Sequence, residues 1–552
     1  MTRRQTVAAG AATRVLVVVL AAVLVIVAVV YGRSLGYGFL SWDDDQNVTA
    51  NRILLEGPWW RFWFAPYQGL YIPPVYTLWS ILAALQSPLN PLLFHGVNVL
   101  LHLANTLLVL FLARRFMPSG GALAAAAFAA LLFALHPLQV ETVAWVTGCR
   151  DLLCAFWLLL ATLLYLRAEG RLWPSAFAWL VFVVALLSKP SAVALPAALL
   201  LLDIIACQTP WRKALLRLLP WFALVPPVVI ITQQVQAEGV DQALQQLTLW
   251  QRSVVALDSF GFYAGKALWP SGLAIDYGHS PQLVLAGQGL AVDLAVLGGV
   301  VLTVIFCRGR LRRPGLGWLL WGAALMLPTS GLVVFSYQHT STVADHYVYV
   351  PLVGMAIAAA WLLSGLEGRS RVALGSVLVL AAGVTSSLRL PVWSGDESLY
   401  PAMVASKPRS FAGLIGLAAM SLRAKRYEEA LGYVNKAQEV EPLNIAALAD
   451  KGLALARLGR YSELLAELGT KMPDRKLILD YPLSAPDMAT LLMTVAFAQI
   501  RTGQAKESLP TLCRARFADA ANPDVLTFVP MVAEYLGKKA DDPDLCEADY
   551  RR

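Results

Sequence analysis

The sequence predicts an all-α protein: a polytopic bundle of about eleven membrane-spanning helices, followed by a C-terminal α-solenoid. Of its 552 residues, 58% are hydrophobic and only 14% are charged, whereas ordinary soluble domains carry roughly 25% charged residues. Apolar runs near the roughly 20-residue length that a bilayer requires recur up to residue 390. Beyond residue 395 a pattern recurs at an offset of 34 residues, which is typical of stacked helix pairs. We therefore predict a membrane domain at 1–394 and a repeat domain at 395–552.

The first apolar run, from about Val15 to Val30, follows three arginines. It has the charge order of a signal sequence, but no small-x-small cleavage site precedes the stretch "SWDDDQNVT". We expect a retained anchor that enters from the cytoplasm, with the N-terminus inside. Asp43, Asp44 and Asp45 then lie outside, in a first external loop at 33–91.

Ten further apolar runs are predicted to span the membrane. They lie near 92–113, 121–138, 152–167, 174–188, 190–206, 215–235, 289–306, 316–334, 347–364 and 372–390. With this count, every cytoplasmic loop contains arginine, and one of them reads "CRGRLRRPG". The external loops are poorer in Lys and Arg for their length, as the positive-inside rule requires. An odd number of spans places the C-terminal region outside, and 250–270 is expected to be an interfacial or re-entrant helix.

The C-terminal region has a globular composition and an internal repeat. The segments "LRAKRYEEALGYVNKAQEVEP" and "ARLGRYSELLAEL" align at the 34-residue offset, and a weaker copy lies near 489–516 after an insertion. Small and large residues fall where a tetratricopeptide helix pair needs them: Leu414, Leu417, Ala418, Ala430, Ala437 and Pro442, then Gly452, Gly459 and Tyr461. Because one pair cannot bury its own apolar face, copies stack into a concave solenoid. A plain helical bundle is the alternative, and either one would offer a docking surface.

Composition and missing motifs exclude several classes of function. The net charge of +8 is explained by arginines in cytoplasmic loops, and no basic stretch interleaved with aromatics predicts nucleic-acid binding. The sequence contains no P-loop, GxSxG or HExxH, which argues against ATP-driven transport, serine hydrolysis and zinc proteolysis. Most of the six cysteines are expected to be small core residues, but Cys513 and Cys546 can pair if their domain faces an oxidising compartment.

Polar residues also occur inside an apolar run. His95, Asn98, His102 and Asn105 follow one another at spacings of three, four and three residues, so they share one face of a helix. Polar groups at membrane depth are expensive and mark either function or contacts inside the bundle. We favour hydrogen bonding between helices over direct substrate contact.

A second group of polar residues gathers at the predicted outer surface, on the side of the three aspartates. It comprises His136, Glu141, Arg150, Asp151, Lys189, Asp345, His346 and Tyr347. Snorkelling cations and a hydrogen-bonded turn are the structural alternatives. A carboxylate can accept the proton of an attacking hydroxyl, and cations can stabilise a departing phosphate. This combination suits transfer from a lipid-linked phosphate to a polar acceptor outside the membrane.

Five stretches in order, followed by the repeats, resemble a known family. They are "FLSWDDDQNVTANRILLEG", "FHGVNVLLHLANTLL", "LFALHPLQVETVAWVTGCRDLL", "LLSKPSAVALPAALLLLD" and "ADHYVYVPLVG". The chain is similar to the transmembrane and tetratricopeptide-repeat glycosyltransferases of the GT-C superfamily, as a bacterial relative. The resemblance implies about eleven spans, an acidic motif in the first external loop and transfer of sugar from a polyprenyl-phosphate carrier. In eukaryotic members the product is O-mannosylated protein.

Carried over residue by residue, the acidic motif falls on Asp43 and Asp44, with Asp45 supporting. Either of the first two is the implied base; we favour Asp43 because the catalytic acid of related mannosyltransferases follows an aromatic, here Trp42. His136, Glu141, Arg150 and Asp151 match the "HP…E…R-D" block, and Arg150, Lys189, His346 and Tyr347 are the expected donor-binding residues, with His102 and Asp345 supporting. The chain departs from the family at His346, where relatives commonly have arginine, and at "YIPPVYTLW", where they often have a single proline.

These features together predict a glycosyltransferase of a bacterial inner membrane that modifies hydroxyl groups of a periplasmic protein. Its partners would be a polyprenyl-phosphate-linked sugar, a protein acceptor bound by the repeats, and the lipid bilayer. Three aspartates can bind a divalent ion, but the resemblance implies metal-independent catalysis, so we expect no metal and no cofactor. One alternative is a lipid or cell-surface polysaccharide as acceptor; another is a scaffold or transporter without catalysis.

Overall fold

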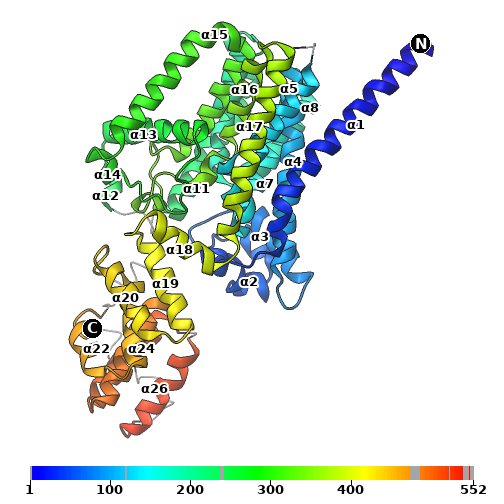
Figure 1. Ribbon diagram of the computed structural model, residues 1–552. Coiled ribbons are helices and arrows are strands. Elements are labelled where there is room, and N and C mark those ends of the chain that lie inside the picture. Colours follow the sequence, from blue (N-terminus) through cyan, green and yellow to red (C-terminus); the bar gives the residue numbers. More distant parts are fainter. Residues whose placement is uncertain are drawn as a thin grey trace. The chain divides into compact units, whose positions relative to one another are not determined.

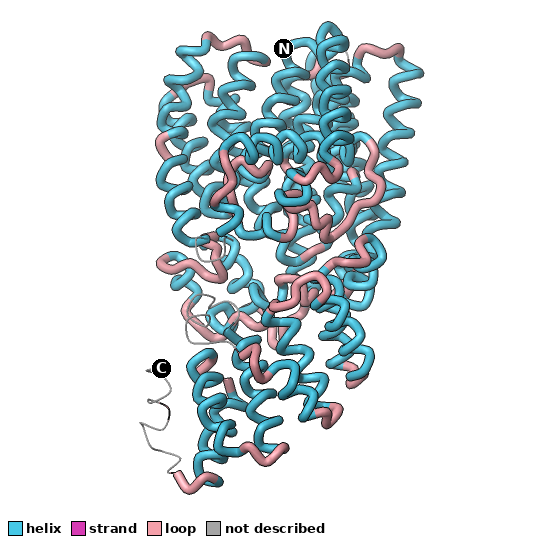
Figure 2. The backbone as a smooth tube through the Cα atoms, turned by 90° about the vertical axis from the view of Figure 1, so that its left-hand side faces the viewer, coloured by secondary structure: helices cyan, strands magenta, loops and turns pink. Residues whose placement is uncertain are grey.

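The computed structural model describes residues 3–118, 121–236, 242–472, 485–520, 522–538 and 546, and these form two compact units, Met1–Ser398 and Leu399–Arg552. Within this described part, the named elements are all helices, and extended pairing is limited to an isolated bridge between Tyr67 and Leu70 (Figures 1 and 2). The predicted all-α class is therefore confirmed. Part of the external loop at 236–288, the insertion before the third repeat and most of the extreme C-terminus lie outside the described residues.

The first unit contains seventeen described α-helices joined by short turns. Their bounds are α1 Arg3–Tyr31, α2 Arg52–Leu55, α3 Pro73–Ala84, α4 Pro91–Phe116, α5 Ala122–Leu135, α6 Val140–Ala144, α7 Cys149–Ala168, α8 Leu172–Ser188, α9 Leu195–Ile205, α10 Trp211–Phe222, α11 Val225–Gln236, α12 Gln242–Gln245, α13 Leu249–Leu268, α14 Pro281–Leu285, α15 Leu290–Met326, α16 Pro351–Ser364 and α17 Gly368–Arg389. Single turns that shape the candidate site are η2 Asp45–Thr49, η5 Val146–Gly148 and η10 Asp345–Val348.

Six described helical segments are long and apolar enough to cross a membrane, and the bent pair Ala122–Leu135 with Pro137–Ala144 would make a seventh. The six are Thr13–Gly36, Pro91–Phe116, Val146–Ala168, Trp211–Gln236, Leu290–Thr329 and Gly368–Trp393. Other predicted spans coincide with the shorter apolar helices α8, α9 and α16. The chain is a multi-pass membrane protein by length and composition, while the count of about eleven stays a prediction.

The segment predicted as the loop "CRGRLRRPG" has an unexpected form. Helix α15 continues through it and breaks at Arg312, whose φ of 49° and ψ of 179° are not helical. Pro314 follows two residues later, and a proline inside a helix removes a backbone hydrogen bond and favours a kink in the preceding turn. A break in one long helix therefore replaces most of the expected loop, and the two predicted spans 289–306 and 316–334 lie on either side of it.

Close packing in the membrane unit depends on small residues. α5 is rich in alanine and packs against α4, α16, α1 and α17; Figure 1 shows α5, α16 and α17 side by side. Between α15 and α16, a Cβ added to Gly354 would lie 2.2 Å from the carbonyl oxygen of Trp318. In lipid, the hydrophobic effect does not drive helices together, so small residues that let two helix backbones pack closely stabilise their contact. The helix at 250–270 is α13, which lies crosswise to the bundle helices in Figure 1.

The second unit is built from antiparallel helix pairs. Its helices are α18 Asp396–Ser406 at the boundary, then α19 Phe411–Arg423, α20 Tyr427–Gln438, α21 Ile445–Arg457, α22 Tyr461–Leu468, α24 Ala485–Arg501, α25 Ala505–Ala518 and α26 Pro523–Tyr535. The predicted repeat residues Leu414, Ala418, Ala430 and Ala437 are buried. Pairs α19/α20, α21/α22 and α24/α25 stack in order, so the solenoid-like C-terminal part is confirmed. Cys513 and Cys546 form the expected disulfide.

Candidate functional site

The aspartate triplet occupies a turn in which Asp43 and Asp44 have opposite surroundings. Asp44 is fully buried, and its Oδ1 accepts hydrogen bonds from the backbone N–H of Thr147 at 2.9 Å and from the Thr147 hydroxyl at 2.5 Å. Its Oδ2 accepts from the N–H of Leu40 at 3.0 Å. Burial raises the pKa of Asp44 to about 7, against these hydrogen bonds, which lower it. A pKa near neutrality suits a base, but a side chain with no exposed surface cannot reach an acceptor.

Asp43 is the accessible member of the triplet. Its side chain is 44% exposed, and its Oδ2 accepts a hydrogen bond of 3.3 Å from Nη2 of Arg150, which is 15% exposed. The backbone of Asp43 has a φ of 67°, in the left-handed region. Few residues with a side chain adopt this conformation, although Asp and Asn tolerate it best. The backbone carbonyl of Asp43 accepts two hydrogen bonds from Asn47, one from its backbone N–H at 3.0 Å and one from its side-chain amide at 2.9 Å. These bonds keep the turn in place.

Asp45 begins the single turn η2 and is partly buried. Its Oδ1 accepts a hydrogen bond of 2.7 Å from the N–H of Gln46. Burial raises the pKa of Asp45, and the neighbouring Asp43 raises it further. Asp45 thus shapes the turn that presents Asp43.

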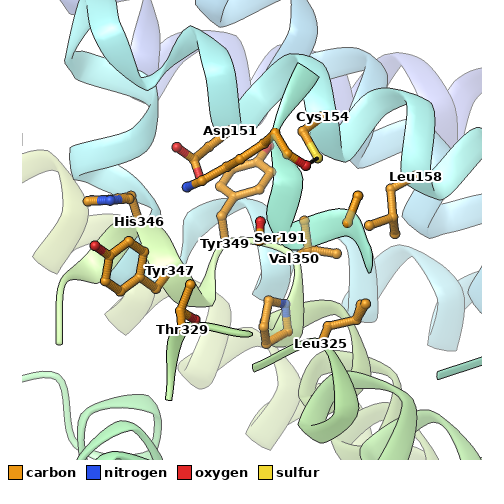
Figure 3. Close-up of a pocket in the computed structure, with 13 residues that line it drawn as sticks. Asp151, Cys154, Leu158, Ser191, Leu325, Thr329, His346, Tyr347, Tyr349 and Val350 are labelled. Carbon is orange, nitrogen blue, oxygen red and sulfur yellow. Dashed lines mark hydrogen bonds and ion pairs between the residues drawn. The ribbon is translucent and has the colours of Figure 1, made fainter. Parts of the chain in front are cut away.

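A narrow cavity lies between α7, the turn η6 Pro190–Ala194 with the preceding Lys189, the end of α15 and the 346–351 segment. Lys189 forms an ion pair with Asp151 and lies over the ring of Tyr347, with Nζ 5.4 Å from its centre. Figure 3 shows Asp151, His346 and Tyr347 at one side of the cavity, and the apolar Leu158, Val350 and Leu325 at the other. The cavity therefore has a polar end that carries a cation and an apolar end.

At the polar end, the partly buried His346 pairs with the buried Glu141. Nδ1 of His346 lies 2.5 Å from Oε1 of Glu141. Burial lowers the pKa of His346 well below its usual range, and the positive charges of Lys189 and Arg150 lower it further. Both effects favour the neutral imidazole, so His346 does not supply the fixed charge of the arginine common in the resembled family. Lys189 and Arg150 remain as the cations of this region.

Asp345 has partners that sequence reasoning missed. Its Oδ2 accepts a hydrogen bond of 2.8 Å from Nη2 of Arg389, and its Oδ1 accepts one of 2.6 Å from the hydroxyl of Tyr277. All of Asp345 is buried, so this contact is a structural ion pair that fixes η10. The signal for Arg389 was visible, since it is an arginine at the predicted outer end of the last apolar run.

The remaining predicted residues have structural contacts. The ring of His102 lies between the hydroxyl of Tyr349, 2.8 Å from Nδ1, and the carbonyl of Ala134, 3.1 Å from Nε2. Asn98 and Asn105 donate to backbone carbonyls of Trp145 and Leu152 at 2.7 Å and 3.0 Å. The polar stripe on α4 thus makes the contacts within the bundle that we favoured.

His136 lies farther from the cavity than its place in the "HP…E…R-D" block suggested. Its Nε2 contacts the carbonyl of Ala267 in α13 at 3.0 Å, and its Nδ1 accepts from the N–H of Leu138. It therefore ties the end of α5 to α13. Among the described residues that line the cavity, neither His136 nor His102 is present.

Glycine is required at one position near the site. A Cβ added to Gly148 would lie 2.2 Å from the carbonyl oxygen of Thr142, closer than real contacts allow. Gly148 ends η5, the turn whose Thr147 holds Asp44. The close approach of two backbones therefore sets the position of the donors to the aspartate triplet.

Among the described residues, the aspartate triplet does not bring three ligand atoms together in the way that a metal-binding cluster requires. Both oxygens of Asp44 already accept hydrogen bonds from the chain, and Asp43 faces Arg150. The His, Cys, Asp and Glu groups of the described chain that could hold an ion give a different cluster, Asp258, His279 and Asp293.

Comparison with known proteins finds several protein O-mannosyl-transferases among the relatives. The chain is 36% identical over 187 residues to protein O-mannosyl-transferase Tmtc2 of Drosophila melanogaster, which is 30% of this chain and 19% of that protein. It is 34% identical over 161 residues to protein O-mannosyl-transferase TMTC4 of Homo sapiens, covering 25% of this chain and 22% of that protein. For Drosophila Tmtc1 the identity is 36% over 181 residues, covering 30% and 20%.

The resemblance to transmembrane, repeat-containing O-mannosyltransferases is thus confirmed over about a quarter of the chain. The matched stretch spans about a fifth of the length of those relatives. No protein-family model matches the sequence. No solved structure matches it either.

Proposed function

We propose that the chain is a membrane glycosyltransferase that moves a sugar from a polyprenyl-phosphate carrier to hydroxyl groups of an extracytoplasmic protein. The similarity to protein O-mannosyl-transferases supports the reaction class. The observation that carries the assignment of the base is the contrast between the exposed Asp43 and the buried, fully bonded Asp44. In this reaction Asp43 accepts the proton of the acceptor hydroxyl as its oxygen attacks the sugar, and the bond between sugar and phosphate breaks.

The donor is proposed to bind with its phosphate at the polar end of the cavity. Lys189 is 17% exposed and pairs with Asp151, whereas Arg150, the residue before Asp151, is 15% exposed and pairs with Asp43. Arg150 also lies over the ring of Trp145, 5.1 Å from its centre, which keeps the guanidinium in the site. Cationic side chains in a water-poor site stabilise the negative charge that develops on the departing phosphate. The apolar end, with Leu158, Leu325 and Val350, suits the start of an isoprenoid chain.

The proposed orientation places the aspartate turn of the first unit and the whole second unit outside the cytoplasm, with the first unit embedded in a bacterial inner membrane. The arginine-rich predicted cytoplasmic loops support this orientation. The disulfide between Cys513 and Cys546 supports it independently, because disulfides persist in oxidising compartments such as the periplasm. A reporter fused after residue 400 tests the proposal, since an external signal is expected and a cytoplasmic one would reverse the topology.

The acceptor is proposed to be a protein that docks on the stacked helix pairs of the second unit. Repeat solenoids present extended surfaces to partners, and the relatives are named for protein modification. A lipid or polysaccharide acceptor keeps the same chemistry at Asp43 and remains the second candidate. It requires the repeats to recruit a partner enzyme instead.

The decisive experiment compares O-linked glycopeptides from the wild type, a deletion strain and deletion strains complemented with wild-type or Asp43→Asn protein. We expect glycopeptides that vanish on deletion and return only with the wild-type gene. Identical glycopeptides in all four strains would exclude protein glycosylation. If instead a lipid-linked or surface glycan changes, the second candidate is correct.

A further inference from the structure

A second cluster of ionisable side chains lies away from the proposed catalytic turn. Asp258 belongs to α13, His279 to the segment before α14, and Asp293 to the first turn of α15. One ligand atom from each lies within 4.8 Å of the other two. Their sequence positions are 21 and 14 residues apart, so they do not form a short motif that sequence analysis could detect. The cluster brings together three elements that are otherwise joined by loops.

The buried carboxylate of this cluster, that of Asp258, has one oxygen without a hydrogen-bond partner in the part of the chain that the structure describes. Asp258 has no exposed surface, and its Oδ2 contacts Nε2 of His279. Its other oxygen, Oδ1, is buried and has no hydrogen-bond partner among the described residues. A buried oxygen of an ionised carboxylate that stays unpaired is costly. Because Oδ1 and Oδ2 are bonded to the same carbon of Asp258, the unpaired Oδ1 also lies within the cluster, beside the Oδ2 that contacts His279.

The charge of the cluster is only partly balanced by its neighbours. A second carboxylate, Asp293, faces Asp258 within the same 4.8 Å limit. The lysine of α13 in this region, Lys266, donates its hydrogen bonds elsewhere, to the carbonyls of Ser271 at 2.8 Å and Gly272 at 3.2 Å. Two carboxylates and one imidazole therefore converge with a deficit of positive charge.

We propose that Asp258, His279 and Asp293 bind a divalent transition-metal cation, for which Zn²⁺ is the best probe. One imidazole nitrogen and two carboxylate oxygens are a three-residue ligand set that Zn²⁺ accepts, with a fourth position left for water. Ligand atoms about 2 Å from one ion lie up to roughly 4 Å from each other, so small side-chain adjustments close the site. The imidazole favours Zn²⁺ over Mg²⁺ and Ca²⁺, which prefer oxygen ligands.

The cation would fix the segment that leads to the proposed donor site. The carbonyl of His279 accepts a hydrogen bond of 2.9 Å from the N–H of Thr342. Tyr263 of α13 brackets Ala344, donating to its carbonyl at 3.0 Å and accepting from its N–H at 2.8 Å. Ala344 directly precedes η10, which carries Asp345 and His346. A metal at this cluster thus has a structural, positioning role, and its existence does not depend on the proposed function.

The test uses the full-length protein without a polyhistidine tag, purified in detergent, stripped with a chelator and titrated with Zn²⁺ against a chromophoric competitor. We expect one tightly bound Zn²⁺ per chain and a rise in the thermal midpoint on binding. Asp293→Asn and His279→Gln, which change the two partly exposed ligands, should each weaken binding at least about 10-fold, a lower bound set by the effect of changing an outer-shell partner of a metal ligand. The matched control His339→Gln, an exposed histidine outside the cluster, should bind Zn²⁺ like the wild type.

Two outcomes would overturn the proposal. One is a wild-type protein that takes up no stoichiometric Zn²⁺; the other is equal binding by the wild type and both ligand variants. Should either variant fail to fold, the Co²⁺-loaded wild-type protein supplies the answer. Its visible spectrum must show a nitrogen-containing, four- or five-coordinate site, and an oxygen-only octahedral spectrum counts against the cluster. None of these readouts uses glycosyl transfer, so they are independent of the proposed activity.

Discussion

At the scale of single residues, two adjacent aspartates have different surroundings: Asp44 holds the turn, and Asp43 is the proposed base. The hydrogen bonds of Asp44 join segments 103 residues apart in the chain, whereas Asp43 keeps an exposed carboxylate beside Arg150. Hydrogen bonds to a buried charged group are among the stronger ones in proteins. We therefore expect substitutions at the two positions to affect different measurements.

Asp43→Asn should lower the turnover number by about 10²–10⁴-fold, the usual contribution of a general base, and leave the thermal midpoint unchanged. Asparagine tolerates the left-handed φ of this residue, so the turn is retained. Asp44→Asn should instead destabilise the protein by about 1–3 kcal/mol, because its amide NH₂ faces a donor and leaves a buried group unsatisfied. Steady-state kinetics and thermal unfolding of the two purified variants make the comparison.

The outcome that contradicts this assignment is the reverse pattern. If Asp44→Asn keeps its thermal midpoint and loses turnover, while Asp43→Asn transfers sugar normally, Asp44 is the base. Asp45→Asn serves as the neighbouring comparison. Its principal bond is to the adjacent N–H of Gln46, so its effect on turnover should be smaller than that of Asp43→Asn.

The ion pair between Arg389 and Asp345 gives a second prediction at this scale. Arg389→Met should destabilise the first unit by about 3–5 kcal/mol, because it leaves the buried carboxylate of Asp345 without its charge partner. The double variant Asp345→Asn/Arg389→Met should recover part of that loss. Thermal unfolding in detergent measures both variants. A single variant as stable as the wild type would show that Asp345 is held by Tyr277 alone.

At the scale of elements, the turn η5 depends on one close backbone approach. Gly148→Ala should shift η5 away from α6, since the added Cβ would lie 2.2 Å from the carbonyl oxygen of Thr142. Thr147 moves with the turn, so both the stability and the turnover number should fall. The matched control is Gly432→Ala, a glycine with nothing within 4 Å of an added Cβ, which should fold normally. Wild-type behaviour of Gly148→Ala would show that the turn is adaptable.

The helices could be predicted from the sequence, but most of their pairings could not. Apolar length alone predicts α1, α4 and α17 as spans, and the 34-residue offset predicts the stacked pairs of the second unit. The contact between Asp43 and Arg150 joins residues 107 positions apart, and spacing gives no information on such a pair. Arg389 itself stands out as an arginine at the end of an apolar run, but its pairing with Asp345, 44 positions away, does not.

The break in α15 shows a different limit of the sequence. Four arginines from Arg308 to Arg313 predicted a solvated loop, because charged runs are usually excluded from apolar helices. Arginine is nevertheless a good helix former, and the helix runs through most of the segment before it breaks at Arg312. The arginine-rich composition therefore indicated where the chain turns between the two spans, but not that the break is centred on a single residue.

At the scale of the whole molecule, the two units are expected to have separable tasks. A protein truncated after Ser398, where the two compact units divide, should retain donor use but modify a different or smaller set of proteins. Glycopeptides from cells expressing the truncated and the complete chain measure this. An unchanged set of modified proteins would show that the solenoid does not select the acceptor. Complete loss of modification, with the truncated protein stably inserted, would assign the repeats a role in transfer itself.

The left-handed backbone of Asp43 also separates two kinds of selection at one position. With a φ of 67°, the conformation admits glycine, asparagine and aspartate more readily than other residues. A library of all residues at position 43, sorted for membrane expression, should therefore retain mainly those three. The same library sorted for glycan output should retain aspartate alone. The difference between the two survivor sets measures how much of this residue's identity is required by chemistry and how much by the turn.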